Sequence, residues 1–293
     1  RRIGGRRGSI GVRRVGRLGV GGRTAPQPFQ DGALGIVRQH GEQLLAGILQ
    51  RAKKGESLAE LGADVVVLDL SSAACREVAG RIAQTSVGRT MPLAVDISQD
   101  AAARSVPRRV LSRLGRLDIL VNCAAMVGTS RLQGWVSPFE GQSSSSWRKA
   151  IETNLTAPFV LTQACAEALA ASGHGSVINI GSLYGLLGPD MSLYAGTKMG
   201  NPAAYSASKG GLLQFTRWLA TVLAPRIRVN SITPGGIERG QPASFQRRFI
   251  KRTPLKRMST EEDLKGALAY LASDLSAYVT GHNLAVDGGW TAW

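Results

Sequence analysis

Short apolar runs alternate with longer amphipathic segments along the chain from about residue 62 onward. The apolar runs are rich in β-branched residues, which is typical of strands that are buried on both faces of a parallel sheet. The segments between them have the hydrophobic periodicity of helices. We therefore predict strands at 65–68, 92–95, 117–121, 176–180, 227–232 and 283–286, and helices at 71–86, 99–114, 147–171, 204–223 and 261–271.

This alternation predicts an α/β fold, namely a single Rossmann-like domain built on a doubly wound parallel sheet with helices on both faces. Ser146 is a plausible N-cap for the helix at 147–171. Ligands of such sheets bind beyond the carboxyl ends of the strands. Polar residues that directly follow a strand are therefore the first candidates for a functional site.

Composition divides the chain into two parts. Its 293 residues are 43% hydrophobic, which suits one domain with a substantial core. The net charge is +16, and residues 1–31 hold +7 of it, from eight Arg against Asp31. We predict that residues 1–31 are an Arg/Gly-rich leader, disordered or atypical in structure, and that 32–293 form the Rossmann-like domain.

The cysteines and the apolar runs exclude several classes of protein. Cys75, Cys123 and Cys165 form no CxxC pair, which argues against a disulfide framework or a zinc site. We expect no metal, and the cysteine usage fits the reducing cytoplasm. No apolar run is long enough for a membrane span, so we expect no membrane partner.

Acidic and small residues follow the first three predicted strands of this pattern. Asp69 follows the first strand, and a carboxylate there can bind an adenosine ribose, which favours NAD over NADP. Asp96 and Ile97 follow the second strand, where they could meet an adenine ring. Asn122 and Ala124 follow the third strand, where small residues allow a cofactor to approach the backbone. Each position alone fits ordinary turn preferences as well as a binding role.

A sharper signal lies after the strand at 176–180. Ser182 follows that strand, and Tyr205 and Lys209 then stand four residues apart at the start of a predicted helix. Residues at this spacing share one helix face. A lysine ammonium beside a phenol stabilises the phenolate and so favours proton transfer. A serine hydroxyl near them could hold a substrate oxygen, so the set suits the interconversion of an alcohol and a carbonyl.

At this point the chain resembles the short-chain dehydrogenase/reductase family over about residues 61–293. The matching pieces occur in the family's order, and the ordered set is far more specific than a YxxxK motif alone. They are NCAA at 122–125, Asn154 within ETNL, Ser182, YSASK at 205–209, RVN at 228–230, PGG at 234–236 and VDGG at 286–289.

The resemblance implies a role for each matching residue. Tyr205 would be the catalytic acid/base, Lys209 would lower its pKa and bind the nicotinamide ribose, and Ser182 would orient the substrate oxygen. Asn154 would anchor a water, with Pro158 freeing a backbone carbonyl by a kink. Further implied cofactor contacts are Pro234, Gly235 and Ile237. The family also implies a homodimer or homotetramer.

A second YxxxK motif begins at Tyr194 and lies closer to Ser182 along the chain. Gly196, Gly200 and Pro202 make 194–203 a poor helix, so Tyr194 and Lys198 would not share a face. We therefore predict that Tyr205 is the catalytic tyrosine. The stretch 183–203 is then an insertion near the entrance to the substrate site.

The family's glycine-rich phosphate loop is altered or displaced here. The nearest match, Gly32 to Gly35, follows no apolar strand, and Gly35 lies 34 residues before Asp69, against about 20 expected. Three explanations remain open: a first strand at 15–20 with a long loop to Gly32, a rebuilt cofactor loop, or a leader that arises from a shifted reading frame or start site. An altered or artefactual N-terminus is favoured.

The substrate is predicted by class alone. A segment between Pro234 and Glu261 corresponds to the family's substrate lid, and six basic residues at 247–257 could attract an anion or form a solvated helix face. The insertion and the C-terminal VDGGW are similar to dehydrogenases of bacterial surface-sugar and flagellin-glycan pathways, with gluconate-type and 3-oxoacyl reductases as near relatives. We expect a polar secondary alcohol or ketone, sugar-like or acidic.

Three alternatives stay open beside that reading. The chain could reduce a 3-oxoacyl thioester. It could be a fold-retaining pseudoenzyme with impaired cofactor binding, although Asn154, Ser182, Tyr205 and Lys209 are intact. It could also carry an RGG-like nucleic-acid arm in residues 1–23, but no aromatic residue occurs there, which makes nucleic acid an unlikely partner.

Overall fold

The computed structural model describes residues 33–37, 57–84, 86–127, 130 and 132–293. Seven parallel strands form one sheet in the order β3-β2-β1-β4-β5-β6-β7. The chain order reverses between β1 and β4, as in a doubly wound sheet. The strands are β1 (Ala33–Val37), β2 (Asp64–Asp69), β3 (Thr90–Ala94), β4 (Ile119–Asn122), β5 (Gly175–Ile180), β6 (Ile227–Pro234) and β7 (Asn283–Val286).

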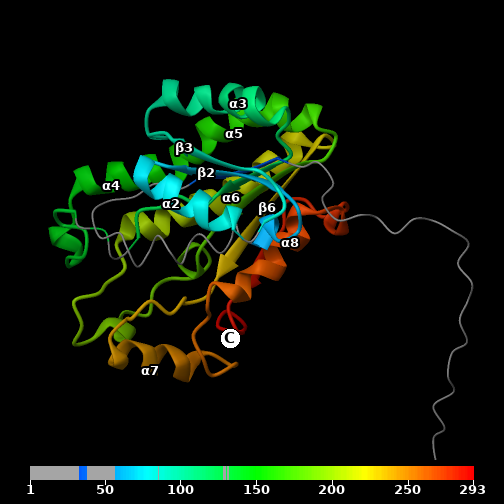
Figure 1. Ribbon diagram of the computed structural model, residues 1–293. Helices are drawn as coiled ribbons and strands as arrows, with labels where there is room; N and C mark the ends of the chain where they lie inside the picture. Colours follow the sequence, from blue (N-terminus) through cyan, green and yellow to red (C-terminus); the bar gives the residue numbers. More distant parts are fainter. Residues whose placement is uncertain (1–32, 38–56, 85, 128–129, 131) are drawn as a thin grey trace, which may run out of the picture.

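Alternate strand residues pack against helices on opposite faces of this sheet. Val66 and Leu68 of β2 belong to the core cluster shared with α3, α5 and α6, whereas Val65 and Val67 belong to the cluster shared with α2 and α8. This follows from the two-residue period of a strand. Figure 1 shows α3 and α5 side by side on one side of the sheet. The helices are α2 (Ser72–Ala83), α3 (Asp100–Leu114), α5 (Ala157–Ala171), α6 (Ala203–Leu223) and α8 (Lys265–Ala272).

The helix predicted at 147–171 is three consecutive elements. They are α4 (Ser144–Ile151), a π-helical turn (Glu152–Thr156) and α5. The predicted N-cap was wrong, because the Ser143 hydroxyl caps α4 by accepting from the Ser145 N–H. Ser146 lies inside the helix instead, and its hydroxyl donates to the Gln133 carbonyl at 2.7 Å. In a run of four serines, the sequence does not show which one ends the loop.

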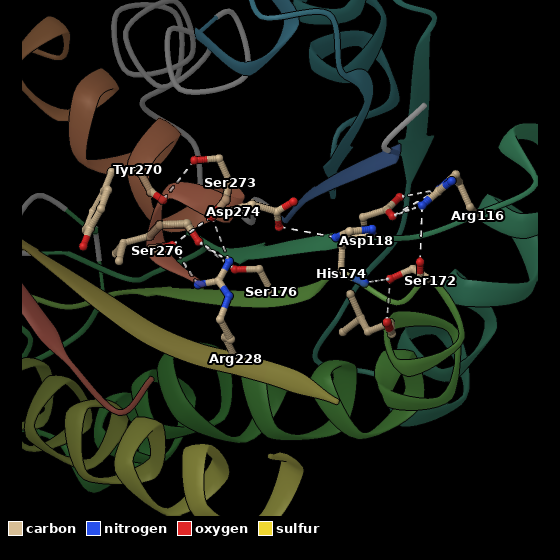
Figure 2. A network of polar contacts seen from close by, with 12 residues as sticks. Arg116, Asp118, Ser172, His174, Ser176, Arg228, Tyr270, Ser273, Asp274 and Ser276 are labelled. Atoms are coloured by element: carbon tan, nitrogen blue, oxygen red, sulfur yellow. Dashed lines mark hydrogen bonds and ion pairs between the residues drawn. The ribbon is translucent and has the colours of Figure 1, made fainter. Parts of the chain in front are cut away.

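A polar network at the amino ends of β5 and β6 fixes the end of α8 to the sheet (Figure 2). Arg228 of β6 donates to the carbonyls of Leu271 and Ser273 at 3.1 and 3.2 Å, and to the Ser276 hydroxyl at 2.8 Å. Ser176 of β5 donates to the same Leu271 carbonyl at 2.9 Å. These bonds satisfy carbonyls that a helix leaves without partners at its C-terminus. Arg228 of the RVN motif is therefore structural and lies at the opposite end of the strands from the site described below.

Helix α7 (Ala243–Arg252) stands apart from the layers, below the sheet in Figure 1. It packs through Phe245 and Phe249 onto a third core cluster with Leu193, Tyr194 and Trp290. This cluster joins α7 to the insertion 183–203 and to the C-terminal segment. The insertion and α7 together cover the carboxyl ends of the central strands.

Candidate active site

A cavity of about 420 Å³ lies beyond the carboxyl ends of β4, β5 and β6. Its wall is formed by the residues that follow these strands, by the insertion 183–203 and by α7. Three of the predicted catalytic residues, Ser182, Tyr205 and Lys209, line this one cavity. A doubly wound sheet places its ligand site at this edge.

Ser182 follows β5 directly and begins a short 3₁₀ helix (Leu183–Gly185). Its hydroxyl accepts from the Tyr184 N–H at 3.3 Å, so the side chain is held at the start of that turn. Gly181 precedes it because a Cβ there would lie 2.9 Å from the side chains of Leu213 and Thr233. The close packing of this glycine fixes the place at which Ser182 enters the cavity.

Tyr205 and Lys209 lie one turn apart near the start of α6, as the sequence predicted. Lys209 is 2% exposed, and its ammonium donates to the Ile180 carbonyl at the end of β5 at 2.7 Å. That bond ties the amino end of α6 to the strand that carries Ser182. Lys209 is thereby fixed one helical turn from Tyr205 in the wall of the same cavity.

The competing motif at Tyr194 has a different setting. Tyr194 ends a 3₁₀ turn (Met191–Tyr194), and no helix runs from there to Pro202. The prediction that this stretch is not helical is therefore confirmed. Burial raises the pKa of Tyr194 far above its ordinary value. Both findings make Tyr194 a poor proton-transfer group, although it lines the same cavity.

Asn154 is fully buried in the π-helical turn rather than in the cavity wall. Its side chain binds the backbone of Met126 in both directions, at 2.7 and 3.1 Å, and donates to the Ser208 hydroxyl at 3.0 Å. Pro158 has no N–H to give the Asn154 carbonyl four residues earlier. That backbone carbonyl, rather than the amide side chain, is thus the group through which Asn154 could hold a water.

Most of the predicted cofactor contacts that follow β3 and β4 have side chains that are buried or bonded to other protein groups. The Asn122 amide is buried and donates to Thr162 at 3.2 Å and to Asn179 at 2.8 Å, so its side chain ties β4 to its neighbours. Ala124 and Ile97 belong to the core cluster beside α3 and α5. The Asp96 carboxylate accepts from the N–H and the hydroxyl of Ser98. Cys123 and Ala125, which alternate with these, line the cavity instead.

The predicted glycine loop was wrongly placed. Gly35 lies in the middle of β1, paired with Val66 and Leu120 on its two neighbours. A residue hydrogen-bonded between two strands cannot form the turn that follows the strand. Gly32 and the alternative strand at 15–20 lie outside the described residues, as does the segment 38–56 that follows β1.

Asp69 ends β2 with its side chain 1% exposed. Its carboxylate accepts from the Ser71 N–H at 2.9 Å, and this bond fixes its orientation at the strand end. Asp69 lies at the same edge of the sheet as the catalytic cavity, two strands away from β4. The position suits the adenosine ribose of a dinucleotide whose nicotinamide reaches the cavity.

The turn after β6 closes the cavity opposite Ser182, and Pro234, Gly235 and Ile237 all line it. A Cβ at Gly235 would lie 2.8 Å from the backbone of Asp287, so only glycine fits there. Ile237 forms an isolated bridge with Ser259. The turn is therefore held by two neighbouring segments, which pre-forms the wall at which the resemblance places the nicotinamide.

Sequence reasoning did not identify the residues at the substrate end of the cavity. They come from the insertion and from α7, two segments whose positions depend on tertiary contacts. A local sequence signal exists for Phe245 and Phe249, whose spacing of four residues places them on one face of α7. The main residues at the substrate end are Tyr184, Tyr194, Met199, Phe245, Phe249 and Met258.

Two basic residues of α7, Arg248 and Arg252, bind the protein itself. Arg248 donates to the carbonyls of Leu193 and Ala195 at 3.2 and 2.6 Å. Arg252 pairs with Asp190 at 2.6 Å and stacks over Trp290 at 4.5 Å. These contacts attach α7 to the insertion, whereas Arg247 and Lys251 on the same helix are exposed to solvent.

The cysteines and potential metal-binding side chains of the described residues do not form a common cluster. The three cysteines are free, and no cluster of three potential metal-binding side chains occurs among these residues. None of the helices described is long and apolar enough to cross a membrane.

A parallel sheet of this order with Ser, Tyr and Lys in a cavity at its carboxyl edge defines the class of dinucleotide-dependent oxidoreductases. Comparison with known proteins supports the assignment to this class of oxidoreductases. A family model described as enoyl-(acyl carrier protein) reductase matches residues 53–291. The chain belongs to the short-chain dehydrogenase/reductase family, and it is an oxidoreductase of that family.

Individual relatives cover nearly the whole described domain. The chain is 35% identical to trans-4-hydroxycyclohexanecarboxylate dehydrogenase of Sinomonas cyclohexanicum, over 82% of this chain and 88% of the relative. It is 31% identical to the 3-oxoacyl-(acyl-carrier-protein) reductase of Escherichia coli, over 80% and 89%. Among solved structures, a short-chain dehydrogenase from Leptospira borgpetersenii with bound NAD⁺ matches with a TM-score of 0.73 and 32% identity, over 90% of this chain and 94% of that one.

Proposed function

We propose that the protein is an NAD-dependent dehydrogenase that interconverts a secondary alcohol and a ketone on a polar, acidic or sugar-like substrate. The observation that carries the proposal is the single cavity that gathers Ser182, Tyr205 and Lys209 opposite the Pro234–Ile237 turn. This set pairs a proton-transfer group with a wall suited to a nicotinamide.

The described residues fit the cofactor at both of its ends. Asp69 offers a fixed carboxylate for ribose hydroxyls, and the close packing of Gly235 on Asp287 forms a flat wall for the nicotinamide. When bound, the nicotinamide would accept or deliver the hydride. A carboxylate at Asp69 would repel the 2′-phosphate of NADP, which supports NAD as the preferred cofactor.

The protein's own residues would handle the proton. The Tyr205 phenol would take the proton from the substrate hydroxyl during oxidation and return it during reduction. The Lys209 ammonium would stabilise the phenolate form. The Ser182 hydroxyl would hold the substrate oxygen beside that phenol, so that the alcohol carbon faces the nicotinamide wall.

A route for the proton leads away from Lys209 through α5 and its preceding π-helical turn. Asn154 is locked by Met126 and Ser208, and Ser208 is the neighbour of Lys209 on α6. This locking would place the Asn154 backbone carbonyl toward a water that connects the lysine with solvent. Asn154 would thus act as a positioning residue.

A second candidate reaction is the reduction of a 3-oxoacyl thioester. The Escherichia coli relative is named for that activity, and the family model is described as an enoyl-(acyl carrier protein) reductase, which also acts on acyl thioesters. The mainly apolar wall formed by Phe245, Phe249 and Met258 would accommodate an acyl chain. The catalytic residues would act in the same way on either substrate.

Two measurements test the proposal. Calorimetry with NAD, NADH, NADP and NADPH should show binding with a preference for the NAD pair. Turnover is then followed at 340 nm on hydroxycyclohexanecarboxylates, sugar alcohols, sugar acids and acetoacetyl thioesters. Absence of binding by all four nucleotides would remove the dehydrogenase proposal and favour the pseudoenzyme. Turnover of the thioester alone would favour the second candidate.

A further inference from the structure

Two tyrosines from the insertion face each other at the substrate end of the cavity. The Tyr194 hydroxyl donates to the Tyr184 hydroxyl at 2.7 Å, and both side chains line the cavity that holds Tyr205. Tyr184 lies two residues after Ser182, whose hydroxyl accepts from its N–H. The pair is therefore attached to the same turn that positions the serine.

The two tyrosine hydroxyls have two hydrogens between them, and their mutual hydrogen bond uses only one of these. Burial is the main factor that raises the pKa of Tyr184, and it raises that of Tyr194 still further, so both phenols are protonated at neutral pH. Whichever way the mutual bond runs, the second hydrogen remains for a third group.

Among the described residues, no protein acceptor for that second hydrogen is present. The Tyr194 ring is 8% exposed and packs against Phe245 with ring centroids 5.3 Å apart, which fixes it in place. Tyr184 is the more accessible of the two and already accepts from Tyr194. The remaining hydrogen thus lies on Tyr184, which borders the cavity.

The other polar side chains at this end of the cavity bind protein atoms. Asn201 donates to the Ser206 hydroxyl at 2.7 Å, and Gln241 donates to the Ile237 carbonyl at 2.7 Å. Arg239 pairs with the buried Glu261. Around them the wall is apolar, with Met199, Phe245 and Phe249. A donor in such a wall strongly favours a ligand that brings an acceptor.

We propose that the Tyr184–Tyr194 pair selects the substrate by donating a hydrogen bond to a second oxygen, distant from the reacting carbon. Tyr194 orients Tyr184, and Tyr184 contacts the substrate. The matching substrates are secondary alcohols or ketones with a carboxylate or hydroxyl at their other end. This inference rests on the proposed function and names the substrate class for its site.

The test compares two alcohols that differ in the distal group, trans-4-hydroxycyclohexanecarboxylate and cyclohexanol. With NAD, the unchanged protein should favour the hydroxy acid in kcat/KM by about tenfold or more, the range of a hydrogen bond to a charged acceptor. Tyr184→Phe should abolish that preference by lowering the value for the hydroxy acid, with less than about a twofold change for cyclohexanol. Tyr194→Phe should lower the preference for the hydroxy acid by about threefold, mainly through a higher KM for that substrate.

Tyr278→Phe is the matched control, because Tyr278 is fully exposed and should leave both values unchanged. If another alcohol of the panel is the better substrate, the same comparison is made with its analogue that lacks the distal oxygen. An unchanged preference in Tyr184→Phe would overturn this inference and leave the proposed function standing. Absence of turnover for every alcohol and ketone with either cofactor would overturn both.

Discussion

The phenols of Tyr194 and Tyr205 line one cavity, but their surroundings give them different chemistry. We propose that Tyr205, which lies one turn from the Lys209 ammonium on α6, is the proton-transfer group. Tyr194 donates a hydrogen bond to Tyr184, and burial raises its pKa, so this phenol keeps its proton. One tyrosine is suited to proton transfer and the other to binding.

This difference predicts distinct effects of two conservative substitutions. Tyr205→Phe should lower kcat by a factor of about a hundred or more, the typical share of a positioned acid/base, because no group replaces the phenol proton. Tyr194→Phe should keep kcat within a few fold. Steady-state kinetics on any turned-over alcohol provides the comparison, with NAD binding by calorimetry as the check that both variants are folded. The reverse pattern would assign the catalytic role to Tyr194.

The carboxylate of Asp69 leads us to expect a preference for NAD over NADP. In Asp69→Asn, the bond from the Ser71 N–H can be kept by the amide oxygen, while the negative charge is lost. We expect NAD to bind about tenfold more weakly and NADP to bind more tightly, because the repulsion of the 2′-phosphate is removed. Asp64→Asn is the control, since Asp64 begins the same strand at the opposite edge of the sheet, where it pairs with Arg89. Equal affinities for both nucleotides before and after the change would contradict the role of Asp69.

At the scale of elements, the strand and helix order was predictable because buried parallel strands leave a strong apolar signal. The strand predicted at 65–68 extends over Asp64–Asp69, and the helix predicted at 204–223 begins one residue earlier. The first strand escaped prediction because Ala33–Val37 follows Arg- and Gly-rich sequence and contains Gly35 itself. The π-helical turn also escaped, since it depends on the tertiary bonds of Asn154 and on Pro158.

The candidate site was predictable in its catalytic part and not in its substrate part. Ser182, Tyr205 and Lys209 are held by one strand end and one helix, whose local signals are strong. Tyr184 and Tyr194 depend instead on how an insertion without long elements folds against α7. The buried bonds of the Asn122 side chain to Thr162 and Asn179 were not predictable either, because they depend on which segments lie beside β4.

The end of α8 gives a prediction for stability. Arg228→Met should lower the free energy of unfolding by about 2 to 4 kcal/mol, because the hydrogen bonds of the guanidinium to Leu271, Ser273 and Ser276 are lost in a partly buried position. Arg226→Met is the matched control two residues away, where the side chain is exposed and should change stability by less than about 0.5 kcal/mol. Urea unfolding followed by circular dichroism measures both. An Arg228→Met variant as stable as the unchanged protein would contradict this prediction, because it would mean that water replaces the hydrogen bonds of the arginine at no cost in free energy.

At the scale of the whole molecule, the net charge of +16 separates into parts with different meanings. Residues 1–31, with +7, lie outside the described residues, and their assignment as a leader stays a prediction. In the domain, the basic run on α7 pairs with Asp190 and with backbone carbonyls. The charge of the domain is therefore weak support for a polyanionic partner.

The outer faces of α5 and α6 carry an aromatic row that predicts self-association. The Phe159 ring packs at a tilt against Phe215, and Phe215 stacks on Trp218, with ring centroids 5.9 and 6.2 Å apart respectively. Phe159 and Trp218 are nevertheless 41% and 55% exposed, and Val222 beside them is 54% exposed. Contiguous apolar surface of this kind usually marks an interface. We expect a homodimer or homotetramer that covers this row.

Light scattering after size exclusion should therefore give a mass that is two or four times 31.0 kDa. Trp218→Glu should shift the mass toward the monomer, because a charge buried in an apolar interface without a partner is costly. Val87→Glu is the control, since Val87 is 94% exposed in the loop between α2 and β3, away from the row. A monomer at all concentrations of the unchanged protein would contradict the prediction, and an unchanged oligomer in Trp218→Glu would place the interface on another face.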